Sequence, residues 1–95
     1  MGKSVTIDGN NFSDLSGFLD EVEKVLAPAL GRQFGRNMNA FNDVLRGGFG
    51  VHEYEEGLDF TWMNGNKSRE DLGNALFDDI IGIIKGHDHV NLILQ

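Results

Sequence analysis

Residues 58–63 read LDFTWM, the clearest strand pattern in the sequence. Leu58, Phe60 and Trp62 alternate with other residues at the period of two that is typical of a β-strand with one buried face. We therefore expect a strand over residues 58–63 with its three large apolar side chains in the core.

Shorter segments of the same kind lie near both ends of the chain. Residues 4–7 place Val5 and Ile7 on one face, and residues 90–94 alternate in the same way. Helical patterns separate the three strands, so the strands cannot form hairpins and instead pair in parallel through right-handed crossovers. The sequence predicts an α/β fold with a three-stranded parallel sheet. The element order is strand-helix-helix-strand-helix-strand, in a single domain over residues 1–95.

Three main helices are expected to pack on this sheet, and each opens with a residue type that caps helix N-termini. They run from Ser13 to just before Pro28, from Asn37 to about Arg46, and from Ser68 to Lys85. Each has apolar residues three and four positions apart, which predicts one buried face. In the third helix this stripe consists of Leu72, Ala75, Leu76, Ile80, Ile83 and Ile84.

The composition narrows the possible functions. The chain has 95 residues and no cysteine, which excludes disulfides and thiolate metal sites. Fifteen acidic residues face eight basic ones, for a net charge of −7, which argues against nucleic-acid binding. The charge favours a basic protein partner, or it simply keeps a small domain soluble. Without a signal segment or a long apolar run, we expect a cytoplasmic protein that is monomeric when free and has no membrane contact.

No pattern in the sequence predicts catalysis or a cofactor. The histidines at positions 52, 87 and 89 form no nucleophile–base set. His87-Asp88-His89 could suggest a metal site. However, neighbouring side chains at the start of a strand point to opposite faces, so an exposed turn is favoured. Gly47-Gly48-Phe49-Gly50 matches the GxxG of KH nucleic-acid modules, but acidic flanking residues favour a loop that ends a helix.

Two segments could bind a partner. The loop at residues 53–59 carries four acidic residues, and it is either a solvated loop or an arm that meets a basic surface. In the second helix, Asn39 and Asp43 are four residues apart and share one face, with Asn42 near it. Taken alone, that face could also be an ordinary polar helix surface.

Residues 34–45, FGRNMNAFNDVL, resemble the loop and helix that characterise the barstar family of intracellular ribonuclease inhibitors. The family pattern is an aromatic-glycine step, an asparagine, and two acidic positions four apart around an alanine. The opening strand with Ile7-Asp8-Gly9, the central Phe60-Thr61-Trp62 and the closing strand are also similar to the family. The resemblance covers nearly the whole chain and implies the same fold.

The resemblance also implies a function. Barstar-type proteins occlude the active site of a basic ribonuclease with this helix and its leading loop, and an aspartate takes the place of the RNA phosphate. Asp43 occupies the matching position here. The other positions expected to contact a basic ribonuclease or ribonuclease toxin are Phe34, Gly35, Asn37, Met38, Asn39, Asn42, Gly48 and Phe49.

This chain departs from the family pattern at several positions. Asn39 stands where the family has its first acidic residue, and Asn42 stands at a tryptophan position. Asp78 and Asp79 are both candidates for the acidic residue that the last helix contributes. These differences predict a related ribonuclease with a different cleft. The alternative is a barstar-fold protein that binds a partner other than a nuclease, and a small hydrolase is the least favoured reading.

Overall fold

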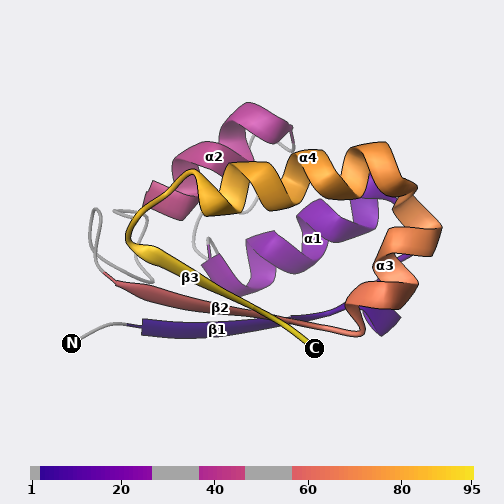
Figure 1. The fold of residues 1–95 in the computed structure, drawn as a ribbon, viewed down its shortest axis with the longest axis horizontal. Coiled ribbons are helices and arrows are strands. Elements are labelled where there is room, and N and C mark those ends of the chain that lie inside the picture. The colour runs from indigo at the N-terminus through magenta and orange to yellow at the C-terminus, as the bar shows by residue number, and fades with distance from the viewer. Residues whose placement is uncertain (1–2, 27–36, 47–56) are drawn as a thin grey trace.

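The computed structural model describes residues 3–26, 37–46 and 57–95. Its strands are β1 (Lys3–Asp8), β2 (Leu58–Met63) and β3 (Val90–Leu94). Its helices are the short 3-10 helix η1 (Gly9–Asn11) and the α-helices α1 (Leu15–Leu26), α2 (Met38–Arg46), α3 (Gly65–Leu72) and α4 (Asn74–Lys85). The predicted α/β fold with a three-stranded parallel sheet is confirmed (Figure 1).

The LDFTWM strand, β2, is the centre of the sheet. It pairs in parallel with β1 on one side and with β3 on the other. Phe60 is aligned with Val5 of β1 and with Leu92 of β3. Leu58, Phe60 and Trp62 are buried, as the alternation predicted. The central strand therefore contributes Trp62, the largest fully buried side chain.

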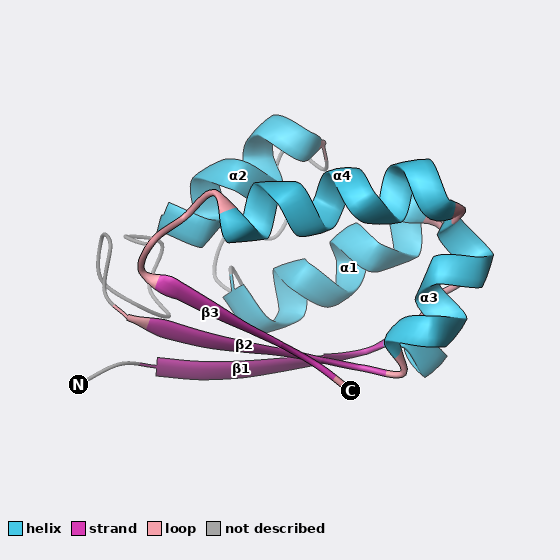
Figure 2. Cartoon of the chain, viewed as in Figure 1, coloured by secondary structure: helices cyan, strands magenta, loops and turns pink. Residues whose placement is uncertain are grey.

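The helices cover one face of the sheet and leave the other face open (Figure 2). Parallel sheets are usually covered on both faces. The open face here is mostly polar, since Thr6 and Thr61 are aligned on it, as are Asp59 and Asn91, while Ile93 and the exposed Met63 are its apolar members. The alternation of apolar and polar residues in β1 and β2 is thus explained by a sheet with a single buried side.

The last helical region differs from its prediction, because two helices replace one. Gly73 separates α3 from α4 with a φ of 87°, a left-handed conformation that a continuous helix cannot contain. Ser68 was expected to cap this region, but it lies inside α3 and is fully buried. The helix begins earlier, at Gly65, because Asn64 turns the chain out of β2 with a φ of 58°.

The helix caps were predicted with mixed success. Asn37 caps α2 as expected, because its Oδ1 accepts a hydrogen bond of 2.8 Å from the backbone N–H of Ala40. At α1 the cap is Asp14 and not Ser13, since Asp14 Oδ1 accepts from the N–H of Gly17 at 2.8 Å. Both residue types can cap a helix, so the sequence alone favoured the wrong neighbour.

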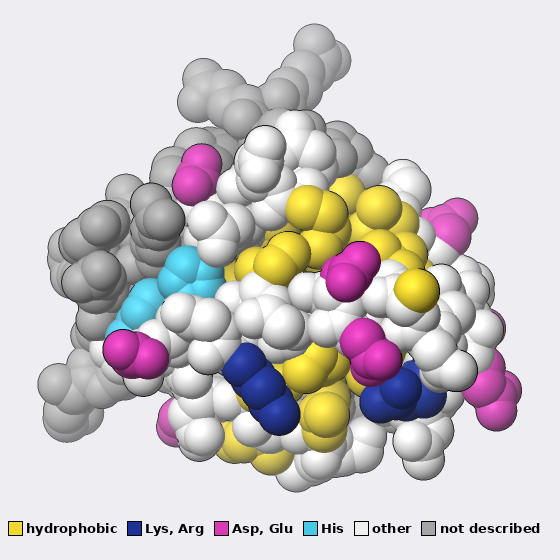
Figure 3. All heavy atoms as spheres, turned by 45° about the horizontal axis from the view of Figure 1, so that its top comes forward, with side chains coloured by type: hydrophobic (Ala, Val, Ile, Leu, Met, Phe, Trp, Pro, Cys, Tyr) yellow, Lys and Arg dark blue, Asp and Glu magenta, His cyan; other side chains and the backbone are white. Residues whose placement is uncertain are grey.

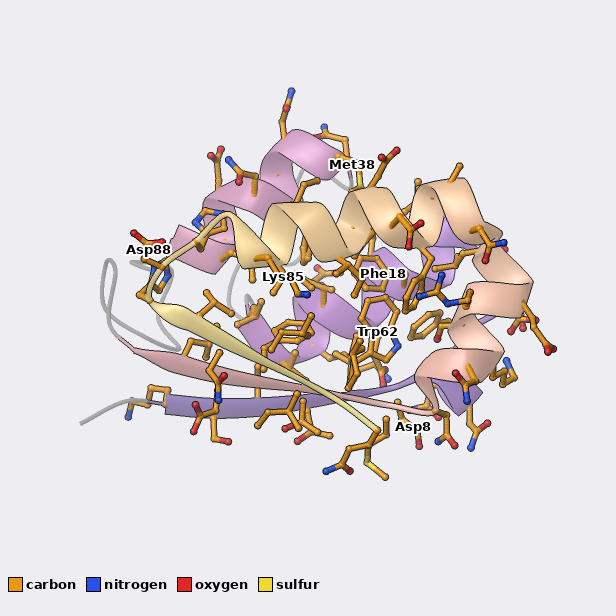
Figure 4. The ribbon with its side chains drawn as sticks, in the orientation of Figure 1. Asp8, Phe18, Met38, Trp62, Lys85 and Asp88 are labelled. Atoms are coloured by element: carbon orange, nitrogen blue, oxygen red, sulfur yellow. The ribbon has the colours of Figure 1, made fainter. Side chains whose placement is uncertain are left out.

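Aromatic rings fill the space between the sheet and the helices. Trp62 stacks on Phe18 with ring centroids 5.1 Å apart, and it lies 5.1 Å from Phe77 (Figure 4). Phe18 in turn meets Phe41 of α2 edge to face at 5.2 Å. Phe77 was not part of the predicted stripe of the last helix, whereas Ala75, which was, is exposed. This cluster links α1, α2 and α4 to the central strand.

Candidate partner-binding site

α2 is held rigidly by its buried side. Phe41 and Leu45 are fully buried, and Val44 is 2% exposed. The cap at Asn37 adds a second backbone contact, because the N–H of Phe41 donates to the Asn37 carbonyl at 3.0 Å. A short helix would be marginal by itself, so this packing is what keeps α2 formed.

The opposite side of α2 presents the polar residues predicted to meet a partner. Asn37, Asn39 and Asp43 are exposed, and Met38 and Asn42 are half-buried. Within the described residues, the side chains of Asn39 and Asp43 form no hydrogen bond or ion pair. The spacing of four therefore puts an amide and a carboxylate on one accessible face. The other predicted contact residues, Phe34, Gly35, Gly48 and Phe49, lie outside the described residues, as does most of the acidic loop.

Two histidines from the turn between α4 and β3 lie against α2. His87 Nε2 is 2.7 Å from Asn42 Oδ1, and His89 Nε2 is 2.6 Å from the carbonyl oxygen of Leu45. The two imidazole rings meet edge to face with centroids 5.5 Å apart. The expectation of an exposed turn was wrong for these histidines, because both are half-buried and bonded to the helix. No periodic signal could reveal a contact between residues so distant in sequence.

A hollow of about 520 Å³ lies between α2 and the α4–β3 turn. It is lined by Asn42, Gly82, Ile83, Gly86, His87, Asp88 and His89. The two glycines have no side chain to fill it, and Asp88 is exposed at the turn (Figure 4). Figure 3 shows histidine side chains beside a band of hydrophobic side chains on this side of the molecule. The polar face of α2 thus continues into a recess.

The two acidic candidates on α4 differ in their surroundings. Asp78 Oδ1 accepts from Arg69 Nη1 of α3 at 3.2 Å, and the guanidinium of Arg69 lies 4.5 Å above the ring of Phe77. Asp78 and Asp79 are both exposed and lie one helical turn before Gly82 and Ile83, which both line the hollow. The two candidates differ in that Asp78 is already paired with Arg69.

The described ranges offer neither a metal site nor a helix that could span a membrane. In the described ranges, no group of three or more His, Asp or Glu side chains has the arrangement to hold a metal ion. Among the helices of the same ranges, none is both long enough and apolar enough to span a bilayer. Asp43 is the one charged side chain described on α2, since the side chain of Arg46 is outside the description.

A three-stranded parallel sheet with helices on one side makes this protein a small α/β domain. Its α2 helix exposes a polar face. The chain belongs to the barstar family, because the family model for barstar, the barnase inhibitor, matches residues 2–89. No individual curated protein matches the chain. The family is one of inhibitors and not of enzymes, which supports a barnase-inhibitor type of role in general terms.

Proposed function

We propose that this protein inhibits a basic ribonuclease or ribonuclease toxin by laying α2 across the active site of the enzyme. In this proposal the Asp43 carboxylate enters the site where the enzyme binds an RNA phosphate. The observation that carries the proposal is the exposed carboxylate of Asp43 on a helix whose other face is buried. A phosphate site is lined with cationic donors, and arginine side chains bind a carboxylate through two parallel hydrogen bonds.

Rigidity supports the proposal. Asp43 is followed directly by the buried Val44 and Leu45, and the cap at Asn37 fixes the first turn of the helix. A carboxylate carried on a helix that is already formed binds without the entropic cost of ordering that backbone, which favours affinity. The net charge of −7 supports the same conclusion, because it accelerates the encounter with a basic enzyme.

The proposal includes the cellular setting and the composition of the complex. An inhibitor that protects the RNA of its own cell must act where that RNA is, in the cytoplasm. One inhibitor then occludes one active site, so the complex has one copy of each chain. A monomeric inhibitor suits this arrangement, and an acidic surface disfavours direct binding to RNA.

The inhibition assay follows RNA cleavage while the protein is titrated into barnase-type ribonucleases. Cleavage is expected to stop at a ratio of one to one. Asp43→Ala is expected to weaken binding by about 2–5 kcal/mol, the range for truncating one member of a buried charge pair, with the barnase–barstar complex among the measured cases. Glu70→Ala is the matched control, since it removes an exposed carboxylate from α3. Equal inhibition by the Asp43 and Glu70 variants would contradict the proposal.

A second candidate function rests on the neutral amides of α2. Asn39 and Asn42 stand at positions where the family pattern has an acidic residue and a tryptophan, so this face has one negative charge and one large aromatic side chain fewer than the family pattern. The alternative is a barstar-family protein that binds a partner other than a nuclease. Tight binding to a non-nuclease protein without any effect on RNA cleavage would favour this alternative.

A further inference from the structure

Asn42 has two chemically different ends, and its oxygen is bonded within the domain. Its Oδ1 lies 2.7 Å from His87 Nε2, a normal hydrogen-bond distance. An amide oxygen can only accept, so His87 must donate through an N–H at Nε2. Within the described residues, the NH₂ group of Asn42 makes no hydrogen bond, and Asn42 lines the hollow beside α2.

The neighbouring histidine makes the same kind of bond. His89 Nε2 lies 2.6 Å from the carbonyl oxygen of Leu45, which also can only accept. Both imidazoles therefore donate through Nε2 onto α2, one to a side chain and one to the backbone of the last turn. The carbonyls of a last helical turn lack helical partners, so the bond from His89 satisfies one of them. The α4–β3 turn consequently fixes both the helix and the side chain of Asn42.

We infer that His87 is a positioning residue that turns the NH₂ group of Asn42 toward the partner, so that the partner must present a hydrogen-bond acceptor at this point. The inference deepens the proposed function and rests on it for the identity of the partner. The acceptor is a neutral carbonyl oxygen and not a carboxylate. Asp43 follows Asn42 in the sequence and Asp88 follows His87, and both are exposed. These two carboxylates would repel a carboxylate of the partner at this point.

The orientation has a direct test in the free protein. Nitrogen chemical shifts of the His87 imidazole, measured by NMR at neutral pH, report which ring nitrogen carries the proton. A protonated Nε2 is expected. A proton on Nδ1 alone would overturn the inference, because Nε2 would then accept and the amide of Asn42 would be reversed. This NMR measurement needs no partner, so it tests the orientation of Asn42 separately from the proposed function. If no ribonuclease were inhibited, the proposed function would be wrong, but the orientation would still be decided.

The consequence for binding is tested with two variants of His87. His87→Gln places an N–H donor near the position of Nε2, whereas the shorter His87→Asn side chain reaches only the position of Nδ1. Loss of a neutral hydrogen bond corresponds to about three- to tenfold in affinity. We expect that loss for the Asn variant and rescue to within about twofold for the Gln variant. In an Asn42→Ala background the difference between Gln and Asn should vanish. A merely structural role would lower the melting temperature without this pattern of rescue.

Asn42→Asp is the sharpest variant. It keeps the acceptor that His87 needs, but it presents a carboxylate oxygen in place of the outward NH₂ group. The complex is expected to dissociate at least about tenfold faster, because two acceptors then face each other. The added negative charge would otherwise favour a basic partner. Dissociation that is equal to or slower than that of the wild type would overturn the inference.

Discussion

Two ends of this domain use polar residues in opposite ways. At the end that contains η1 and α3, polar side chains form hydrogen bonds with other groups of the domain. Glu21 accepts from Asn11 Nδ2 at 2.8 Å, and Lys67 Nζ donates to the carbonyls of Gly9 and Phe12 at 3.1 and 3.0 Å. At the other end, α2 directs Asn39 and Asp43 outward. Figure 1 shows α3 at the right end of the long axis and α2 in the left half.

Stability and partner binding therefore depend on different parts of the domain. A hydrogen bond made inside the η1–α3 end contributes to folding and is not accessible to a partner. A carboxylate held on the surface contributes little to folding, because exposed charges add little stability. We expect variants at the η1–α3 end to change stability without changing affinity, and variants on the outer face of α2 to do the reverse.

The largest expected effect comes from Trp62. It is fully buried against Phe18 and Phe77, so Trp62→Ala should cost about 3–5 kcal/mol in the free energy of unfolding. That is a large part of the total stability of about 5–15 kcal/mol that is typical of a domain. Urea unfolding measures the loss. Partner affinity per folded molecule should fall much less than stability does, because Phe18 lies between Trp62 and Phe41 of α2. A loss of affinity as large as the loss of stability would contradict the separation of the two ends.

A smaller effect is expected from Ser68. Its Oγ accepts a buried hydrogen bond of 3.0 Å from Trp62 Nε1. Ser68→Ala leaves that N–H buried without an acceptor, which costs about 1–3 kcal/mol. The same change in a Trp62→Phe background removes no partner, so its cost should be much smaller there. Equal costs in both backgrounds, measured by chemical denaturation, would show that the hydroxyl acts in another way.

Asn37 is expected to contribute to both stability and partner binding. Asn37→Ala removes the cap of α2 and is expected to cost about 1 kcal/mol of stability. Asn37→Ser keeps a capping oxygen and should retain most of it. Because this cap also orients the helix that carries Asp43, the Ala variant should weaken inhibition more than the Ser variant does. Thermal unfolding and the titration of ribonuclease activity measure the two effects separately.

The sheet was predictable from the sequence because its signal is local. LDFTWM alternates within six residues, and the helical segments that separate the strands leave parallel pairing as the available arrangement. The third helix was less predictable. Ser68 is a good capping residue by type, but in the fold its hydroxyl is bonded to Trp62, and Asn64 starts the helix from a left-handed conformation. Side-chain competition of this kind is decided by tertiary contacts.

The candidate site was predictable to the same local extent. The spacing of Asn39 and Asp43 was enough to put both on one exposed face. The bond between Asn42 and His87 depends on how α4 ends over α2, which no pattern within either helix encodes. The pairing of Asp78 with Arg69 likewise required the break between α3 and α4 at Gly73.

The smallest expected effect is the pH dependence that Glu21 brings to the η1–α3 end. Burial raises the pKa of Glu21, but hydrogen bonds from the side chain of Asn11 and the backbone N–H of Asp8, together with Lys24, outweigh it and hold the pKa below the ordinary value of 4.5. Because these contributions oppose each other, the net effect on stability is modest.

The direction of the effect follows from proton binding. The folded protein binds a proton at Glu21 less readily than the unfolded chain does. The stabilisation is therefore complete above the ordinary pKa and disappears as the pH falls through the lowered one. The free energy of unfolding should decrease from about pH 5 downward, and Glu21→Gln should make that decrease less steep. Asp8→Asn should act in the same direction, since hydrogen bonds from the backbone of Asn10 and the side chain of Asn64 lower the pKa of Asp8. If the free energy of unfolding fell with pH as steeply in the Glu21 variant as in the wild type, the neighbours of Glu21 would not hold its carboxylate in the folded protein. The contrast between the bonded polar groups of the η1–α3 end and the exposed ones of α2 would then rest on Lys67 and Ser68 alone.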